Sequence, residues 1–264
     1  MPWTLTHPAA VLPLRRLCPW ALNFPALVFG SMTPDLGYYI NRFDLSNFAH
    51  TWAGSFVACV PSGLILLVIF YLFCKPVCYA LPAPHREALL PHCPSFPQRG
   101  LTWGIILLSL VLGAWTHNFW DAFTHKEGWF VTRIWWLQQP AFQIGSTTIH
   151  VFLVLQELST LVGLVIIVFA YGFWLRRQGL CSMPDSEPDG WRYLFWTVIA
   201  VVALIVSLPL ALQDASSFPP LSFPFFRSIL FRGAVYGSMV VVPLSLAGTA
   251  MVYGCRPRKP TKSS

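Results

Sequence analysis

The chain has 264 residues, of which 55% are hydrophobic and only 10% are charged. Soluble proteins carry about a quarter charged residues, so this composition excludes a soluble domain and indicates an integral membrane protein. The formal net charge is +7, but the basic residues are scattered over connections and a C-terminal tail. Because they form no continuous stripe, we expect no nucleic-acid partner.

The N-terminal segment, residues 1–17, is short and amphipathic and lacks the basic-then-apolar order of a signal peptide. His7 stands in the sequence Thr-His-Pro, which also suits a helix start, so a capping role is the alternative to a ligand role. Residues 24–35 form an apolar run too short to span a bilayer and end in a Pro-Asp turn at Asp35. We therefore predict a re-entrant or interfacial element before the first span.

Five later segments are long and apolar enough to cross a membrane. They are residues 54–75, 101–125, 149–175, 191–212 and 229–253. The basic tail 256–264 is predicted to be disordered. The sequence thus predicts an all-α polytopic membrane helix bundle with about five transmembrane helices, in which residues 1–255 form a single integral membrane domain.

The connection after the first span carries one group of possible metal ligands: Cys74, Cys78, His85, His92 and Cys93. Their spacing matches no standard zinc finger, and cysteine at a membrane boundary is often only a small apolar or lipidated residue. The seven cysteines contain no Cys-x-x-Cys pair, so no disulfide framework is indicated.

A stronger group ends the second span, in the stretch GAWTHNFWDAFTHKEGW. His117, Asp121 and His125 recur every four residues and therefore share one helix face. One metal ion could bind His117 with Asp121, or Asp121 with His125, but the first and last are about 12 Å apart by helical rise. Other segments must then complete any site. The alternative is that these side chains cap the helix and pair with neighbours.

Charge and span number together predict the orientation. Seven of the 17 lysines and arginines lie on the side of the N-terminal segment, so ten lie on the other side, which we predict to be cytoplasmic together with the C-terminus. His7, Asp35 and His50, which stands at the entrance of the first span, then fall on the outer face. The end of the second span and the start of the third fall there as well.

Glu157 lies about two turns into the third span, where an unpaired carboxylate is costly. It follows His150 by seven residues, which would place both on one helix face. A partner such as Arg133, protonation or a metal ion would satisfy it. If Glu157 is a ligand or a general base, the prediction is that it approaches His117 and Asp121, which requires the second and third spans to be antiparallel neighbours.

These ligands are imidazoles and carboxylates with no thiolate among them. That set suits a catalytic divalent ion of zinc, manganese or iron rather than a structural zinc. Such an ion makes a bound water more acidic, so that it can attack an ester carbonyl or a phosphoester phosphorus.

Several motifs also resemble a known family. They are MPWTLTHPAAVLPLRRL, ALVFGSMTPDLGYY, FAHTWAGSF, THNFWDAFTHKEGW and LQELSTLVGL. Their order and approximate spacing over residues 1–175 are similar to those of a bacterial family of multi-pass membrane proteins catalogued as domain of unknown function 4184. That family is distantly similar to inner-membrane proteins regarded as metal-dependent hydrolases.

The resemblance implies that the metal is carried by five residues: His7, Asp35, His50, His117 and Asp121. One departure concerns the third span, where the family pattern tends to read Gln-His and this chain reads Gln156-Glu157. Glutamate can replace histidine as an oxygen ligand, but the change alters metal preference or marks a member without catalysis.

Two functional hypotheses follow for this protein of the bacterial inner membrane. The first is a metal-dependent hydrolase that acts on a lipid or lipid-linked ester at the outer face. In it, His7, His50, His117 and Asp121 bind the metal, and Glu157 and Asp35 act as catalytic groups or further ligands. The second is a non-enzymatic scaffold or a small-solute or proton transporter whose polar cluster holds helices together.

Overall fold

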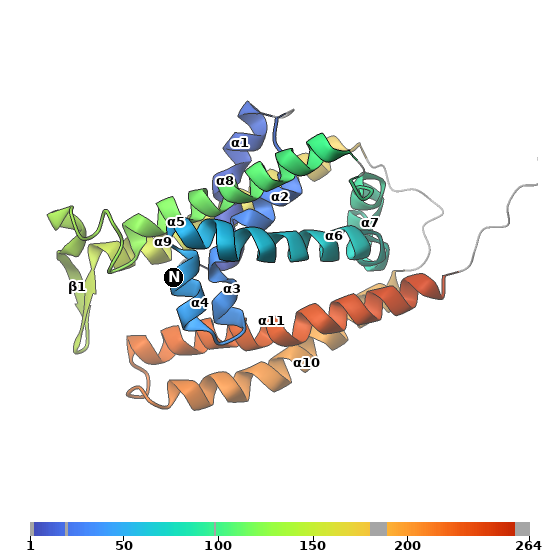
Figure 1. The fold of residues 1–264 in the computed structure, drawn as a ribbon. Helices are drawn as coiled ribbons and strands as arrows, with labels where there is room; N and C mark the ends of the chain where they lie inside the picture. Colours follow the sequence, from blue (N-terminus) through green and yellow to red (C-terminus); the bar gives the residue numbers. More distant parts are fainter. Residues whose placement is uncertain (1–2, 19–20, 98, 180–188, 257–264) are drawn as a thin grey trace, which may run out of the picture.

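The computed structural model describes residues 3–18, 21–97, 99–179 and 189–256. The predicted tail therefore lies outside the described residues, except for its first residue, Arg256. The long helices are α6 (Val60–Ala80), α8 (Gly100–Thr124), α9 (Val151–Arg177), α10 (Gly190–Ala215) and α11 (Phe223–Gly254). Together they confirm the prediction of an all-α polytopic bundle (Figure 1).

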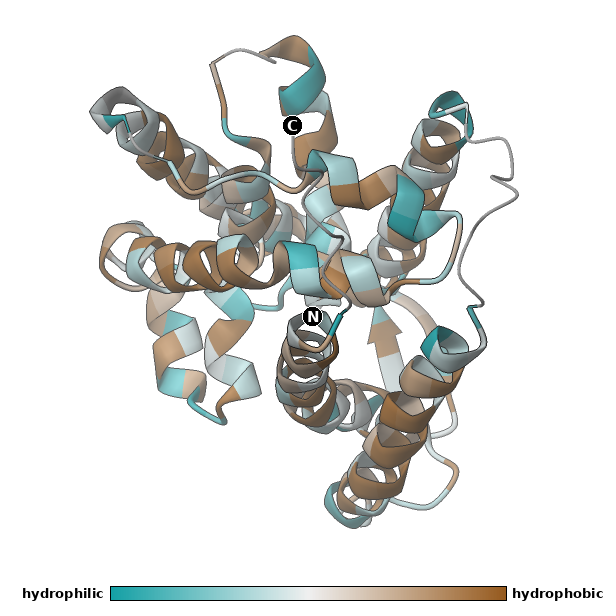
Figure 2. Ribbon diagram, turned by 90° about the vertical axis from the view of Figure 1, so that its right-hand side faces the viewer, coloured by the Kyte–Doolittle hydropathy of each residue, from teal (hydrophilic) through white to brown (hydrophobic). Residues whose placement is uncertain are grey.

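Four of the described helices are long and apolar enough to cross a membrane: the continuous helix Trp52–Ala80, α9, α10 and α11. The remaining predicted span is α8, whose 25 residues extend over about 37 Å at the helical rise. Large apolar side chains project outward from the spans, such as Phe169, which is 74% exposed, and Leu204, which is 62% exposed. Figure 2 shows the same pattern, with hydrophobic residues dominating the long helices. Such a surface requires lipid around it.

Short elements precede and join the long helices. Before α6 come η1 (Thr4–Val11), α1 (Leu12–Leu17), α2 (Phe24–Gly30), η2 (Thr33–Asp35), α3 (Leu36–Tyr39), α4 (Phe43–Ala49), α5 (Trp52–Gly54) and the π-helical turn η3 (Ser55–Cys59). After α6 come α7 (His85–Leu89), η4 (Leu90–His92), η5 (Trp135–Gln138), β1 (Pro140–Ile144) and β2 (Thr147–His150).

The start of α11 differs from the prediction. The helix begins at Phe223 rather than at Ile229, because the Ser222 side chain accepts a hydrogen bond from the Phe225 amide (3.3 Å) and Pro224 stands in the first turn. Both features are standard helix-start signals.

The connection between α8 and α9 contains a β-hairpin that the sequence analysis did not predict. Strands β1 and β2 pair in antiparallel fashion, with Ile144 opposite Thr147 across a two-residue turn. Gly145 takes a positive φ of 59° in that turn, a conformation that glycine adopts without strain. His150 consequently belongs to a strand and not to the third span.

The helices pack in two groups that meet at α6. Helices α10 and α11 lie along each other, and α11 also packs on α6 (Figure 1). On the other side, α2 packs on both α6 and α8, while η1 contacts α2, α8 and α9. The N-terminal elements are therefore part of the bundle rather than a peripheral extension of it.

The contact between α2 and α8 is close enough to depend on glycine. A Cβ at Gly113 of α8 would lie 2.4 Å from the Leu27 carbonyl oxygen, and one at Gly30 of α2 would lie 2.3 Å from the Leu110 carbonyl oxygen. Buried Ala26, Leu67, Ile106 and Leu110 fill the space between α2, α6 and α8. This close packing of the two backbones holds Ser31, which follows α2, beside the part of α8 that contains Gly113 and His117.

We expect Gly113→Ala to destabilise the protein by about 1–3 kcal/mol, because the added methyl group meets backbone atoms that cannot rotate away. The thermal melting temperature in detergent measures this change. Gly104→Ala is the matched control, because a methyl group at Gly104 of the same helix would meet no described atom within 4 Å. Equal melting temperatures for the two variants would contradict close α2–α8 packing.

Candidate metal centre

Four side chains from three separate segments converge at one end of the bundle. Asp35 ends η2, His50 follows α4, and His117 and Asp121 lie one turn apart on α8. One potential ligand atom from each residue lies within 4.8 Å of the others. The predicted convergence of these four residues is thus present in the structure, and we call them the His-Asp cluster.

The distances within the His-Asp cluster are short. His117 Nε2 lies 3.2 Å from Asp121 Oδ2 and 3.5 Å from Asp35 Oδ1. His50 Nε2 lies 3.3 Å from His117 Nε2 and 3.3 Å from Asp121 Oδ2. Asp35 Oδ1 is 3.8 Å from His50 Nε2. Ligand bonds of about 2.0–2.2 Å to a central zinc-sized ion place neighbouring ligand atoms about 3.3–3.6 Å apart, close to these separations.

Hydrogen bonds to the backbone orient both imidazoles. His117 Nδ1 lies 2.8 Å from the Ser31 carbonyl oxygen, and His50 Nδ1 lies 2.7 Å from the Ser46 carbonyl oxygen. A carbonyl oxygen only accepts, so each Nδ1 carries its hydrogen and donates it. In the neutral rings, Nε2 is then a lone-pair acceptor directed into the cluster, which is the arrangement of most metal-binding histidines.

Asp35 is held in a similar way from outside the cluster. Thr4 donates its hydroxyl hydrogen to Asp35 Oδ2 over 2.6 Å, which leaves Oδ1 facing the imidazoles. The Asp35 side chain is completely buried. Burial without a partner is costly for a carboxylate, so the free oxygen needs a positive neighbour.

The cluster therefore collects acceptors without matching donors. Among the described residues, buried Asp35 Oδ1 and Asp121 Oδ1 have no hydrogen-bond partner, and neither do His7 Nε2 and His125 Nε2. Two neutral Nε2 atoms that lie 3.3 Å apart cannot hydrogen-bond to each other. A cation at the centre would satisfy the Asp35 and Asp121 carboxylates together with the His50 and His117 Nε2 atoms, whereas an added proton on one imidazole would satisfy only part of this set.

His7 lies beside the cluster rather than among its four closest ligands. Its ring stacks on that of His117 with centroids 3.7 Å apart, and its Nε2 is 3.7 Å from Asp121 Oδ1. Burial lowers the pKa of His7 to about 3. The ring is therefore neutral at pH 7, the form in which histidine binds a metal.

A cavity of about 1030 Å³ opens onto the cluster. His50, Asp121 and His125 reach it, and the side chain of His50 is 23% exposed, whereas those of His117 and Asp121 are at most 4% exposed. Aromatic side chains form much of the remaining wall: Tyr38, Trp52, Trp115, Phe119, Trp129 and Phe130. A ligand in the cavity would thus meet one side of the cluster through His50 and Asp121.

The prediction that Glu157 approaches this cluster is wrong. Its carboxylate pairs with Arg227 of α11, with Oε1 3.2 Å from the arginine Nε, and its side chain is 49% exposed. The seven-residue spacing from His150 to Glu157 would place both on one face only if both were helical, but α9 begins at Val151. Gln156 is the residue that faces the interior, at 3% exposure, and the next position points about 100° away from it.

Sequence reasoning also missed several parts of the centre. The carbonyl groups of Ser31 and Ser46 carry no side-chain signal, and Thr4 was not singled out. For His125, the sequence left open whether it or His117 pairs with Asp121; its Nδ1 lies 3.4 Å from Asp121 Oδ2 and it lines the cavity. The four-residue spacing of His125 from Asp121 was the available signal.

Comparison with known proteins identifies one family. Residues 1–252 match the model of the family described as Domain of unknown function (DUF4184). No curated protein and no solved structure matches the chain. The match includes every residue of the His-Asp cluster and extends well past the motifs that first indicated the resemblance.

We expect His117→Ala and Asp121→Asn each to remove most of the bound metal from protein purified in detergent, because each removes one of three or four ligands. Elemental analysis per mole of chain measures this, with about one ion expected in the wild type.

His85→Ala is the matched control, since that ring bonds to the Tyr171 hydroxyl at the other end of the bundle (2.7 Å). Glu157→Gln should leave metal content unchanged as well. Equal metal content in His117→Ala and His85→Ala would rule out the His-Asp cluster as the binding site.

Proposed function

We infer that this chain, which belongs to the family described as Domain of unknown function (DUF4184), is a membrane-embedded metal-dependent hydrolase. The observation that carries the proposal is the convergence of Asp35, His50, His117 and Asp121 within 4.8 Å beside a large cavity. The imidazoles are already oriented by backbone carbonyls, so little rearrangement would accompany metal binding.

The ligand chemistry narrows the choice of ion. Two imidazoles and two carboxylates suit zinc, manganese or iron(II), and they are poor ligands for a soft monovalent ion. When bound, such an ion activates water and polarises a carbonyl or phosphoryl oxygen. Asp35 is better suited to be a ligand than a general base, because its second oxygen accepts from Thr4 and it is completely buried.

With Glu157 paired to Arg227, the best candidate for a proton-transfer group is His125. It lines the cavity, contacts Asp121 through Nδ1 and keeps a buried Nε2 without a partner among the described residues. Burial lowers the pKa of His125 below its ordinary value, so the ring is neutral at pH 7 and can accept a proton. Activity should then fall only as the pH drops below the ordinary histidine range.

The cavity favours an amphiphilic substrate, a lipid or a lipid-linked ester. Its walls are largely aromatic, and it lies at the end of the spans, where lipid headgroups would be within reach. Lys126, which also lines it, offers a positive charge for a phosphate or carboxylate. The distribution of lysine and arginine supports an outer-face location in a bacterial inner membrane.

A non-enzymatic scaffold or a proton or solute transporter is the second candidate. The bonds from His117 to Ser31 and from Thr4 to Asp35 tie separate elements together, as structural polar groups in membrane proteins do. A purely structural role for the cluster would not explain the large cavity beside it.

The side of the membrane on which the C-terminus lies can be tested with a fused reporter. A reporter fused after Ser264 should be active as a cytoplasmic reporter and inactive as an extracytoplasmic one, because five spans separate it from an outer N-terminal region. The opposite pattern would move the cavity to the inner face.

Hydrolysis can be tested with vesicles that contain phospholipid and fluorogenic lipid esters, by following the release of acid, alcohol or phosphate. We expect His125→Gln to retain the metal but to lower kcat by about 10²–10⁴-fold, the usual contribution of a general base or acid. His150→Gln is the control, because its ring bonds to the Gln138 carbonyl outside the cluster (2.7 Å). Unchanged kcat in His125→Gln would exclude the proton-transfer role; no metal-dependent turnover of any ester would favour the non-enzymatic alternative.

A further inference from the structure

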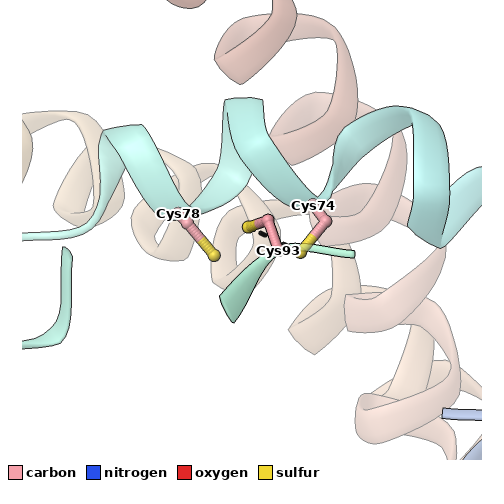
Figure 3. A group of neighbouring side chains, drawn as sticks. All are labelled: Cys74, Cys78 and Cys93. Carbon is pink, nitrogen blue, oxygen red and sulfur yellow. Dashed lines mark hydrogen bonds between the residues drawn. The ribbon is translucent and has the colours of Figure 1, made fainter. Parts of the chain in front are cut away.

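Three cysteines form a second cluster at the opposite end of α6. Cys74 and Cys78 lie on α6, and Cys93 follows η4 and returns to the same place (Figure 3). The three sulfur atoms lie within 4.8 Å of one another, and Cys74 Sγ is 2.8 Å from Cys93 Sγ. We call these residues the three-cysteine cluster.

The chain builds this cluster from a helix and a returning loop. Cys74 and Cys78 are four residues apart and so share one face of α6. Helix α7 and η4 then fold back onto α6, which brings Cys93 between the other two. Asp189, just before α10, supports the loop by accepting the Ala83 amide hydrogen (2.8 Å) and pairing with Arg86 (3.4 Å).

The two histidines that the sequence grouped with these cysteines are directed elsewhere. His85 Nδ1 bonds to the Tyr171 hydroxyl, and His92 Nδ1 donates to the Ala88 carbonyl oxygen over 2.9 Å. The His92 ring also packs edge-on against Trp174. The ligand group that remains is purely sulfur, with Cys78 buried and the other two cysteines partly buried.

We propose that Cys74, Cys78 and Cys93 bind one soft metal ion, Cu(I), as three thiolates. Thiolate ligands select soft ions, and three sulfurs complete the shell of a three-coordinate ion, whereas structural zinc takes four protein ligands. Metal–sulfur bonds of about 2.3 Å in a trigonal arrangement place the sulfurs about 4 Å apart. All three sulfurs already lie within 4.8 Å of one another, and Cys74 Sγ and Cys93 Sγ, which are 2.8 Å apart, would separate by about 1.2 Å on binding.

Binding of Cu(I) releases the three thiol protons, so three thiolates and one monovalent ion leave the site with two net negative charges. Burial raises the pKa of the Cys93 thiol, so the ion itself must drive the loss of the thiol protons. The Lys75 ammonium interacts electrostatically with both Cys74 and Cys93 and offsets a small part of the negative charge. No oxidation or reduction of the protein is required.

This site is independent of the His-Asp cluster. His50 precedes the helix Trp52–Ala80, and Cys74 lies 22 residues beyond Trp52, which is about 33 Å along the helix axis. That distance is close to the thickness of the hydrocarbon core, so the two clusters lie at opposite faces of the membrane. The three-cysteine face is the one that the sequence predicts to be cytoplasmic, where thiols stay reduced.

The experiment uses full-length protein purified in detergent under anaerobic, reducing conditions. Cu(I) is titrated in competition with bicinchoninate, and thiolate-to-copper absorption in the ultraviolet is recorded. We expect one Cu(I) per wild-type chain and loss of this binding in Cys74→Ser, Cys78→Ser and Cys93→Ser. Cys18→Ser and Cys255→Ser, which alter exposed cysteines elsewhere, should bind as the wild type does.

Folding and the hydrolase proposal are controlled separately. Each cysteine variant should keep the melting temperature and the divalent metal content of the wild type, and His117→Ala should still bind Cu(I). Equal Cu(I) binding by the wild type and a variant lacking all three cysteines would overturn the proposal. A Cys74–Cys93 disulfide in the anaerobically purified protein, detected by mass spectrometry, would overturn it too, and zinc held at the same three sulfurs in preference to Cu(I) would overturn the choice of ion.

Discussion

The hydrogen bond from His117 to the Ser31 carbonyl oxygen is the interaction on which the His-Asp cluster depends. It fixes which nitrogen carries the hydrogen and so turns Nε2 toward Asp35, His50 and Asp121. Close contact between α2 and α8, with Gly30 and Gly113 where the two backbones meet, brings the Ser31 carbonyl within reach of His117. The two glycines therefore help to determine which nitrogen of the buried His117 ring carries the hydrogen.

Much of this arrangement was accessible from the sequence. Apolar run lengths located the long helices, because lipid requires each span to satisfy its own backbone hydrogen bonds. The four-residue spacing of His117 and Asp121 predicted a shared face, and span counting brought Asp35 and His50 to the same end. Glu157 was misplaced because residue counting assumed a helix through His150, where the chain forms a strand. The Ser31 and Ser46 carbonyls could not be predicted, because backbone acceptors depend on tertiary packing and leave no residue-type signal.

The return of Cys93 to α6 is a second feature that could not be predicted from the sequence. The pair Cys74 and Cys78 is readable as one face of a helix, but the loop that follows has no periodic pattern. Its path is set by contacts from a distant segment, namely Asp189 before α10. The same loop directs His85 and His92 to Tyr171 and Ala88. A mixed group of five possible ligands in the sequence therefore becomes a group of three sulfurs in the fold.

The helix Trp52–Ala80 carries two centres of opposite chemical character. Nitrogen and oxygen atoms gather near its Trp52 end and sulfur atoms near its Ala80 end, so each end favours an ion that the other would bind poorly. Their separation of about one hydrocarbon thickness also prevents a ligand residue from serving both ions. Because α6 packs against α2 at one level and against α7 and η4 at another, occupancy at either end stabilises a different set of short elements. If both clusters bind ions as proposed, each can be loaded without the other, because the two clusters share no residue.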